Sequence, residues 1–292
     1  ITLNSLTTDR QVRIRNVELT VAAGLTTNAR LSLGTDQWID TGRIRFSGTG
    51  TLGGTGEVLM YPSSGALSQT RIMSAAGTTL TIGSDIEVRG AGQIGSDTGG
   101  PVINQGLIQT VDGFGFSNLI EMRGRWTNAG TIRSEYGAVE LSGTYNGADL
   151  GNMTCLGYGR INLRGTIQNA GQTLSLRGFA NGNIRLVSAT VIGGRIETTR
   201  IDAGGYVWIG QEYDGGAAAV LDGVTLSGEI VLSEEHVVTI RNGLTLDNGV
   251  FALGAPSPFA NFGVLNFTGT QTLGGAGTVE YRLYNSAVRT SA

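Results

Sequence analysis

The stretch Phe46–Val58, FSGTGTLGGTGEV, decides the architecture of this chain, because the sequence contains it twice. It returns 221 residues later (267 − 46) as Phe267–Val279, FTGTQTLGGAGTV, with nine of thirteen positions identical. Upstream, Val12–Asn16 (VRIRN) returns as Val238–Asn242 (VTIRN), at an offset of 226 (238 − 12) that a small insertion around Trp38 would explain. Similarity at a long interval is typical of repeat architectures. We therefore predict one super-repeat unit over about 12–237 and the opening of a second over about 238–292.

The composition favours an all-β protein with many tight turns. Among 292 residues, 48 are Gly and 4 are Pro, with 40% apolar and 15% charged residues. The net charge of −3, without a visible basic stripe, argues against nucleic acid as a partner. All 20 basic residues are Arg, which excludes lysine chemistry, and the single Cys excludes an internal disulfide. No apolar run approaches the length of a membrane helix, so we expect no membrane insertion of this segment.

Short apolar/polar alternations that end at Gly or Asn predict strands of four to six residues and little or no α-helix. One recurring phrase ends in Arg-Gly or Ser-Gly, as in IEVRG (Ile86–Gly90) and INLRG (Ile161–Gly165). A second, Asn-x-Gly, marks turns at Asn104, Asn128 and Asn169. A sandwich would show paired hairpin signals, which are missing. A parallel β-helix of roughly a dozen coils of about 20 residues, continuous over 1–292, explains more.

Phrases such as NQGLIQT, NAGTIRS, VELSGTY, GRINLRGTIQNAGQTLSL and GTQTLGGAGTV resemble the Gly- and Asn-rich passenger repeats of large bacterial surface proteins. These proteins include autotransporter passengers and filamentous-haemagglutinin-like adhesins. The resemblance covers most of the chain, from about Ile72 to Val279. It implies a right-handed parallel β-helix and a secreted or cell-surface location on a bacterium. It carries no catalytic motif, and the sequence contains no Arg-Gly-Asp tripeptide.

Few sequence patterns point to chemistry. Two G-x-G-x-x-G strings, starting at Gly48 and Gly90, lack the following helix that a dinucleotide site needs. The Gly-Gly-x-Gly strings lack the Asp of a calcium-binding β-roll, so we expect no cofactor and no metal. Parallel β-helices also host polysaccharide lyases and hydrolases, which use clustered carboxylates. For that alternative, the candidate catalytic residues are Glu212, Asp214 and Asp40, and the candidate glycan-binding residues are Trp38, Tyr213, Arg43 and Arg45.

The charged residues allow two interpretations. Arg pairs at 13/15, 43/45 and 123/125, and Glu residues at 18, 57, 87, 121 and 140, alternate with apolar positions and so point outward. We expect them to form cross-coil Arg–Glu ladders; the alternative is an arginine face that binds sulfated or acidic glycans.

The sequence therefore predicts a structural, adhesive module rather than an enzyme. It would be a segment of a long repetitive extracellular protein, used as a rod or surface layer. Its expected partners are neighbouring copies or repeats of itself end to end, and surface glycans or other cells. A carbohydrate-active or glycan-binding β-helix is the alternative.

Overall fold

The computed structural model describes residues 1–36, 40–62, 70–111, 118–178, 183–200, 206–210, 216–232, 236–254, 263–282 and 286–291. Parallel strands form a β-solenoid of about 10 turns, which confirms the predicted parallel β-helix. No α-helix lies among the described residues; η3 (Gly147–Leu150) is a short 3-10 turn. The chain divides into two compact units, Ile1–Tyr145 with Asp149–Arg160, and Asn146–Ala148 with Ile161–Ala292.

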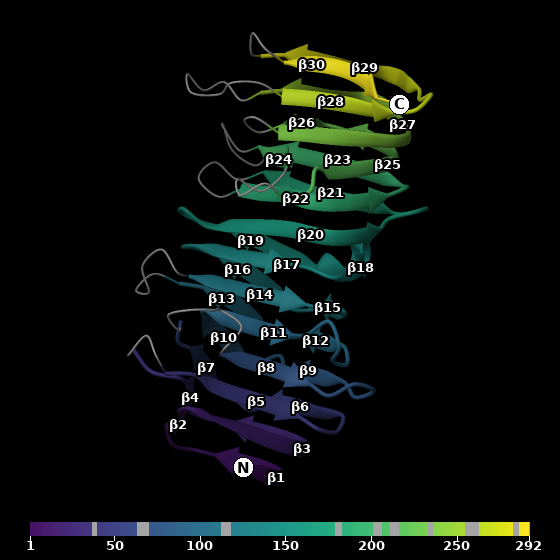
Figure 1. The fold of residues 1–292 in the computed structure, drawn as a ribbon. Helices are drawn as coiled ribbons and strands as arrows, with labels where there is room; N and C mark the ends of the chain where they lie inside the picture. The colour runs from purple at the N-terminus through teal and green to yellow at the C-terminus, as the bar shows by residue number, and fades with distance from the viewer. Residues whose placement is uncertain are drawn as a thin grey trace. The chain divides into compact units, whose positions relative to one another are not determined.

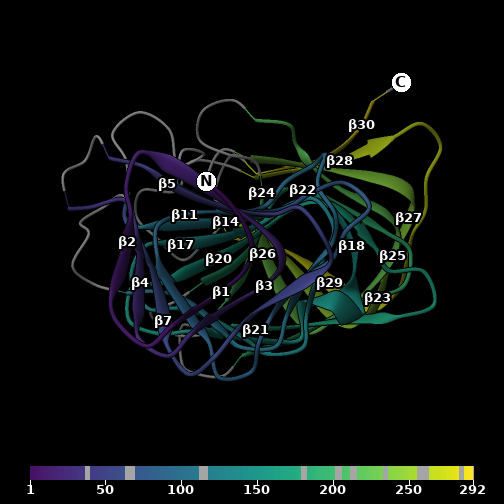
Figure 2. The ribbon, with the colours of Figure 1, turned by 90° about the horizontal axis from the view of Figure 1, so that it is seen from below.

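Each coil of the N-terminal unit contributes a strand to each of three walls, which we call faces A, B and C. Face A contains Val17–Val21 of β3 (Val17–Thr27), β5 (Gly42–Phe46), β8 (Arg71–Ser74), β11 (Gly92–Gly95), β14 (Leu119–Arg123) and β17 (Ala138–Leu141). Face B contains the rest of β3, β6 (Gly50–Gly53), β9 (Leu80–Ile82), β12 (Val102–Asn104) and β15 (Trp126–Asn128). Face C contains β2 (Val12–Ile14), β4 (Arg30–Leu33), β7 (Glu57–Met60), β10 (Glu87–Gly90), β13 (Leu107–Thr110), β16 (Thr131–Ser134) and β19 (Asn152–Cys155). Figure 1 shows these strands stacked in chain order, and Figure 2 shows β2, β4 and β7 together on one side.

Two further strands complete this part of the chain. β1 (Thr2–Thr8) pairs with β3 and forms the first strand of the stack. β18 (Thr144–Asn146) follows β17 directly.

Apolar side chains in register form the core of the coils. On face C, the register partners Leu31, Val58, Val88, Ile108 and Ile132 are all fully buried. Alternation directs every second side chain inward, so each coil places its apolar residue on that of the coil before. Each such side chain stabilises the stack by about 1.5–3 kcal/mol.

Coil length varies mainly at the corner between faces C and A, with smaller changes at the corner between faces A and B. The face C register partners Leu31, Val58, Val88, Ile108 and Ile132 follow one another at intervals of 27, 30, 20 and 24 residues. The shortest coil connects face C to face A through a single residue, Ala91, whereas ten residues separate β7 from β8. Insertions at this corner leave the stacked strands in register. The spacing of equivalent residues along the sequence is therefore irregular, whereas the strands of successive coils still align.

The two Asn-x-Gly phrases of the N-terminal unit, at Asn104 and Asn128, lie at the corner between faces B and C. Turns were predicted at both positions. Asn104 and Asn128 are buried, and Asn104 Nδ2 donates a hydrogen bond of 2.7 Å to Asn128 Oδ1. Asn128 Nδ2 in turn donates to the carbonyl of Leu150 at 2.8 Å. A Cβ on Gly106 or Gly130 would lie 2.3 or 2.2 Å from a backbone oxygen of the preceding coil. Close approach of the coils, not a left-handed backbone, therefore requires these two glycines.

The C-terminal unit is built in the same way from longer strands. Its strands are β20 (Arg160–Gln168), β21 (Thr173–Gly178), β22 (Asn183–Ile192), β23 (Arg195–Arg200), β24 (Val207–Gly210), β25 (Ala219–Ser227), β26 (Glu229–Leu232), β27 (His236–Leu253), β28 (Gly263–Thr268), β29 (Leu273–Tyr281) and β30 (Ala287–Ser291). β27 runs through all three walls of its coil, pairing in turn with β28 and with two parts of β29. Its Asn242 and Asn248, both with positive φ, turn the chain between walls.

The two copies of the repeated stretch occupy the same places within a coil. Phe46 ends one strand, Leu52 lies in the next and Val58 in the third, each paired with the preceding coil. Phe267 and two positions of β29 pair with β27 in the same order. Gly54 and Gly275 hold equivalent corners, with φ of 104° and 89°. Each copy of the stretch therefore includes a corner of the solenoid.

The second match used to define the super-repeat is different. Val12–Ile14 lies on face C, the wall of Val58, whereas Val238–Ile240 pairs with Leu265–Phe267. The two copies of VxIRN therefore do not occupy equivalent places in a coil. What they share is local: each ends at an Asn with φ near +50°, Asn16 and Asn242. The bounds 12–237 and 238–292 remain a prediction from the sequence.

Candidate functional site

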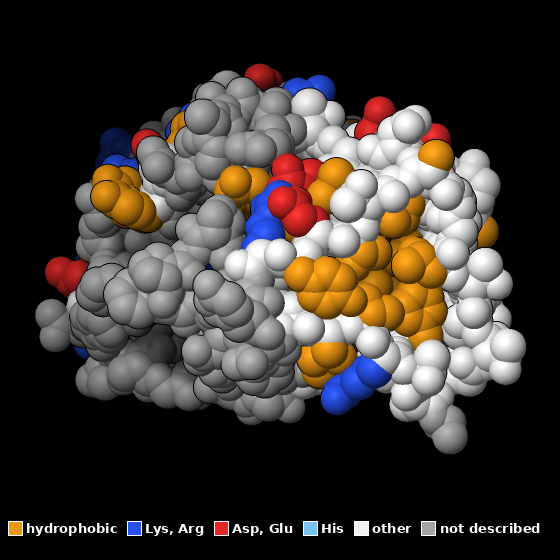
Figure 3. Space-filling view, turned by 90° about the horizontal axis from the view of Figure 1, so that it is seen from above, with side chains coloured by type: hydrophobic (Ala, Val, Ile, Leu, Met, Phe, Trp, Pro, Cys, Tyr) orange, Lys and Arg blue, Asp and Glu red, His pale blue; other side chains and the backbone are white. Residues whose placement is uncertain are grey.

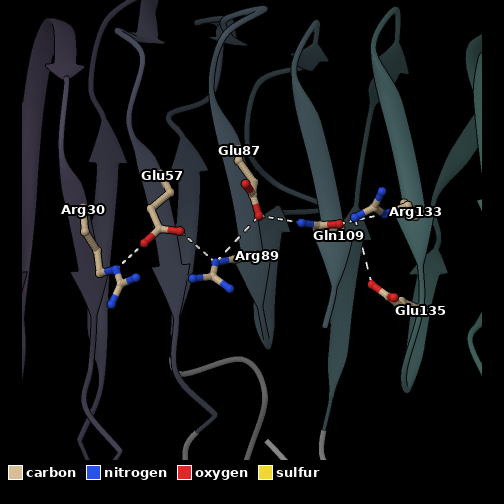
Figure 4. A network of polar contacts seen from close by, with 7 residues as sticks. All are labelled: Arg30, Glu57, Glu87, Arg89, Gln109, Arg133 and Glu135. Carbon is tan, nitrogen blue, oxygen red and sulfur yellow. Dashed lines mark hydrogen bonds and ion pairs between the residues drawn. The ribbon is translucent and has the colours of Figure 1, made fainter. Parts of the chain in front are cut away.

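A row of polar side chains crosses the outer surface of face C (Figure 4). We call this row the face C polar ladder; its members are Arg30, Glu57, Glu87, Arg89, Gln109, Arg133 and Glu135. They come from β4, β7, β10, β13 and β16 and the residue after β16, so the row links five consecutive coils.

Glu57 is the centre of the first half of the ladder. Its carboxylate accepts hydrogen bonds from the Nε of Arg30 on one side and from the Nε of Arg89, at 2.8 Å, on the other. Arg89 Nε also lies 3.7 Å from Glu87. One carboxylate thus joins the coil before it to the coil after it.

The neutral side chain of Gln109 continues the ladder between Glu87 and Arg133. Its amide nitrogen donates to Glu87, and its amide oxygen accepts a 2.8 Å hydrogen bond from Arg133 Nε. Because an amide both donates and accepts, it can join an acid to a base. The charge pattern of the sequence predicted Arg–Glu ladders, and Glu57 and Glu87 are members of one. The bridging Gln was missed, and the arginines are not the predicted pairs.

Electrostatics keep the ladder charged. Burial opposes ionisation of Glu57, but the hydrogen bonds from Arg30 and Arg89 outweigh it and lower the pKa of this carboxyl. The hydrogen bond to Glu57 raises the pKa of Arg30. The carboxylate of Glu57 is therefore ionised across the physiological pH range.

Asp40, a candidate catalytic carboxylate, lies at the corner before β5 and is almost fully buried. Its Oδ2 accepts a hydrogen bond from Thr35 Oγ1 and lies 2.9 Å from Arg15 Nε, while Oδ1 accepts one of 2.7 Å from Asn16. The hydrogen bond from Thr35, opposed by burial and assisted by Asn16 and Arg15, lowers the pKa of Asp40. A carboxylate held ionised by three donors of its own chain is poorly suited to transfer a proton, and it fixes the corner instead.

The remaining candidates divide into two groups. Arg43 and Arg45 lie on the outer side of face A, on either side of the buried Ile44, as predicted. Arg43 is in register with Glu18, and Arg45 is exposed. The candidates Trp38, Glu212, Tyr213 and Asp214 lie outside the described residues.

Exposed aromatic side chains are a feature that the sequence analysis did not single out. Tyr136 and Tyr158 lie in turns of successive coils, with ring centroids 6.2 Å apart. They are 36% and 77% exposed. In the C-terminal unit, Tyr206 and Trp208 form a second pair at 6.1 Å, packed on the buried Val231 and Ala252.

Within the described ranges, no three His, Cys, Asp or Glu side chains gather closely enough to hold a metal ion. The same ranges contain no helix with the length and apolar character to cross a membrane. A comparison of the chain with protein-family models, with curated proteins and with solved structures finds no match in any of the three.

Proposed function

We propose that this chain is a structural and adhesive module, a segment of a long extracellular β-helix that serves as a rod or surface layer. The observation that supports this most is that both sides of one wall tie each coil to the next. Inside face C the apolar side chains stack without a gap from Leu31 to Ile132, and outside it the polar ladder runs across the same coils. A module of this kind extends by adding coils, since each coil bonds only to its neighbours.

The bacterial surface as its location rests on the resemblance to passenger repeats. The alternative, a carbohydrate-active or glycan-binding β-helix, is tested by incubating the protein with polysaccharides and measuring the release of reducing ends. Activity that is present in the wild type and lost in Glu212→Gln would refute the structural proposal.

The last coil shows how such modules would join. Its residues Leu273, Tyr281 and Val288 are 42%, 56% and 38% exposed. Figure 3, which views the molecule from the side where β29 and β30 lie in Figure 1, shows hydrophobic side chains gathered on this surface. In the first copy of the repeat the equivalent Leu52 is fully buried, because the coil of β8, β9 and β10 covers it. Another coil would cover the exposed side chains of the last coil in the same way.

The occupant that we propose for this surface is the first coil of a second copy of the chain. That coil presents β1, which pairs on one side with β3, and the exposed side chain of Ile1; Val17, at the start of β3, is exposed as well. Parallel strand addition would continue the backbone ladders across the junction, and it would bury the apolar residues of both ends.

Sedimentation velocity at increasing concentration, with negative-stain microscopy, tests this end-to-end stacking. We expect reversible linear assembly of the wild type and its loss in Leu273→Asp. Leu156→Asp is the matched control, because Leu156 is also 42% exposed but lies in a turn of the N-terminal unit. A wild type that stays monomeric at high concentration, or equal effects of the two variants, would contradict the stacking.

A further inference from the structure

A row of side chains crosses the outer surface of face A, as the polar ladder crosses face C. We call it the face A row; in register order its members are Glu18, Arg43, Arg71, Gln93, Glu121 and Glu140. Two arginines are direct neighbours in it, without an acid between them. Neighbouring strands lie about 4.8 Å apart, and like charges directly opposite destabilise a sheet.

Arg71 differs from the arginines of the face C ladder. Arg30 and Arg89 each bind a carboxylate there. Within the described part of the chain, the side chain of Arg71 makes no hydrogen bond and no ion pair, and its Nε is buried without a partner. Burial first, and then the charges of Arg43 and Arg123, lower the pKa of Arg71, against a smaller opposing effect of the Glu121 charge. An anion bound at the surface would stabilise a half-buried guanidinium that lies beside a like charge.

Among the described residues, no acid of the row forms an ion pair with Arg71, although the charge of Glu121 acts on it. Gln93 separates Arg71 from Glu121, which places the two strands about 10 Å apart. The side chain of Gln93 is buried, and its amide nitrogen donates a hydrogen bond of 2.8 Å to the carbonyl of Gly95. Gln93 therefore does not link Arg71 to Glu121 as Gln109 links Glu87 to Arg133. On the other side, Arg43 separates Arg71 from Glu18.

We propose that Arg43 and Arg71 together bind an oxyanion, the sulfate or carboxylate group of an acidic polysaccharide, on the outer surface of face A. Arginine suits this ligand because its planar fork donates two parallel hydrogen bonds to one oxyanion. The exposed Arg45 lies on the next outward position of the same strand and adds positive charge beside the pair. Inorganic sulfate shares the chemistry of the group and is a second source of it. The site does not depend on the proposed structural role.

Isothermal titration calorimetry with two probes, sodium sulfate and chondroitin sulfate, tests the site at constant ionic strength. We expect the wild type to bind at least one probe and Arg71→Gln to bind it about tenfold more weakly or worse, because a hydrogen bond to a charged group contributes about 1.5–3 kcal/mol. Arg71→Lys keeps the charge but loses the fork, so it should bind with intermediate affinity. Tighter binding of the polysaccharide than of sulfate identifies a glycan as the ligand; equal affinities identify the free anion.

Arg133→Gln is the matched control, because it removes one positive charge from the same unit at an arginine that already has a partner in the face C ladder. It should bind both probes as the wild type does. Far-UV circular dichroism confirms that each variant is folded, and Arg43→Gln replaces Arg71→Gln if that variant does not fold. Absence of binding in the wild type, or an equal loss in Arg133→Gln, would overturn the proposal.

Discussion

Gly54 offers a sharp test of how the coils are held together. It lies at the corner between faces B and C with φ of +104°, and a Cβ at this position would lie 2.2 Å from the carbonyl oxygen of Thr27 in the preceding coil. That oxygen accepts a 2.9 Å hydrogen bond from the amide of Gly56. Gly54→Ala therefore forces the two coils apart at a point where they are bonded.

The magnitude follows from comparison with Gly77, which has φ of +76° and nothing within 4 Å of its Cβ position. Gly77→Ala bears only the left-handed backbone strain, about 1–2 kcal/mol. Gly54→Ala bears the same strain, about 1–3 kcal/mol of overpacking, and about 1 kcal/mol for the weakened hydrogen bond of Gly56. We expect Gly54→Ala to be the more destabilising by about 2–4 kcal/mol.

Native-state hydrogen exchange is the appropriate assay, because a stack of coils need not unfold in one step. The free energy of opening at the Gly56 amide should fall in Gly54→Ala by the expected difference relative to Gly77→Ala. If the two variants reduce it equally, close approach of the coils is not what selects glycine at this corner, and the argument fails.

Three further outcomes follow from the polar contacts. The lowered pKa of Glu57 means that its contribution to stability is complete above its ordinary value of about 4.5 and is lost as the pH falls through the folded-state value. Glu57→Gln should therefore make the melting temperature depend less on pH in the acid range. Glu135→Gln is the control and should not, because the wild-type Glu135 carboxylate lies 4.0 Å from Arg133. Asp40→Asn should lower the melting temperature at pH 7, measured by calorimetry; an unchanged value would show that the corner does not need the charge. Asn104→Ala should cost about 1–3 kcal/mol in urea unfolding, because the buried Asn128 Oδ1 loses its donor, and a smaller loss than about 0.5 kcal/mol would contradict this.

The fold could be predicted from the sequence because it is specified locally. Alternation within four or five residues sets which side chains point inward, and corner residues such as Gly54 and Asn104 show where each strand ends. The copy at Phe267–Val279 then shows that the unit recurs. None of these inferences requires knowledge of which strands are neighbours.

The outer rows could not be predicted, because they depend on register. Glu57 meets Arg30 only because the coil between them has 27 residues, and the loops that set this length have no periodic signal. For the same reason Gln109 and Arg71 were missed, although both are outward residues of recognisable strands. The same limit explains why VRIRN and VTIRN were taken as equivalent: a local phrase identifies a corner but not the wall to which the corner belongs.

The two outer rows differ in how their charges are paired. On face C every charge from Arg30 to Glu135 has a partner in the row, so these side chains join neighbouring coils. On face A the neighbouring strands place Arg71 beside Arg43. Replacing Arg71 with an apolar side chain of similar size removes a half-buried charge that lies opposite a like charge, an arrangement that destabilises a sheet. Arg71→Met should therefore raise the melting temperature and abolish the binding of sulfate or chondroitin sulfate. If the melting temperature of the ligand-free variant falls instead, Arg71 serves the fold rather than a ligand.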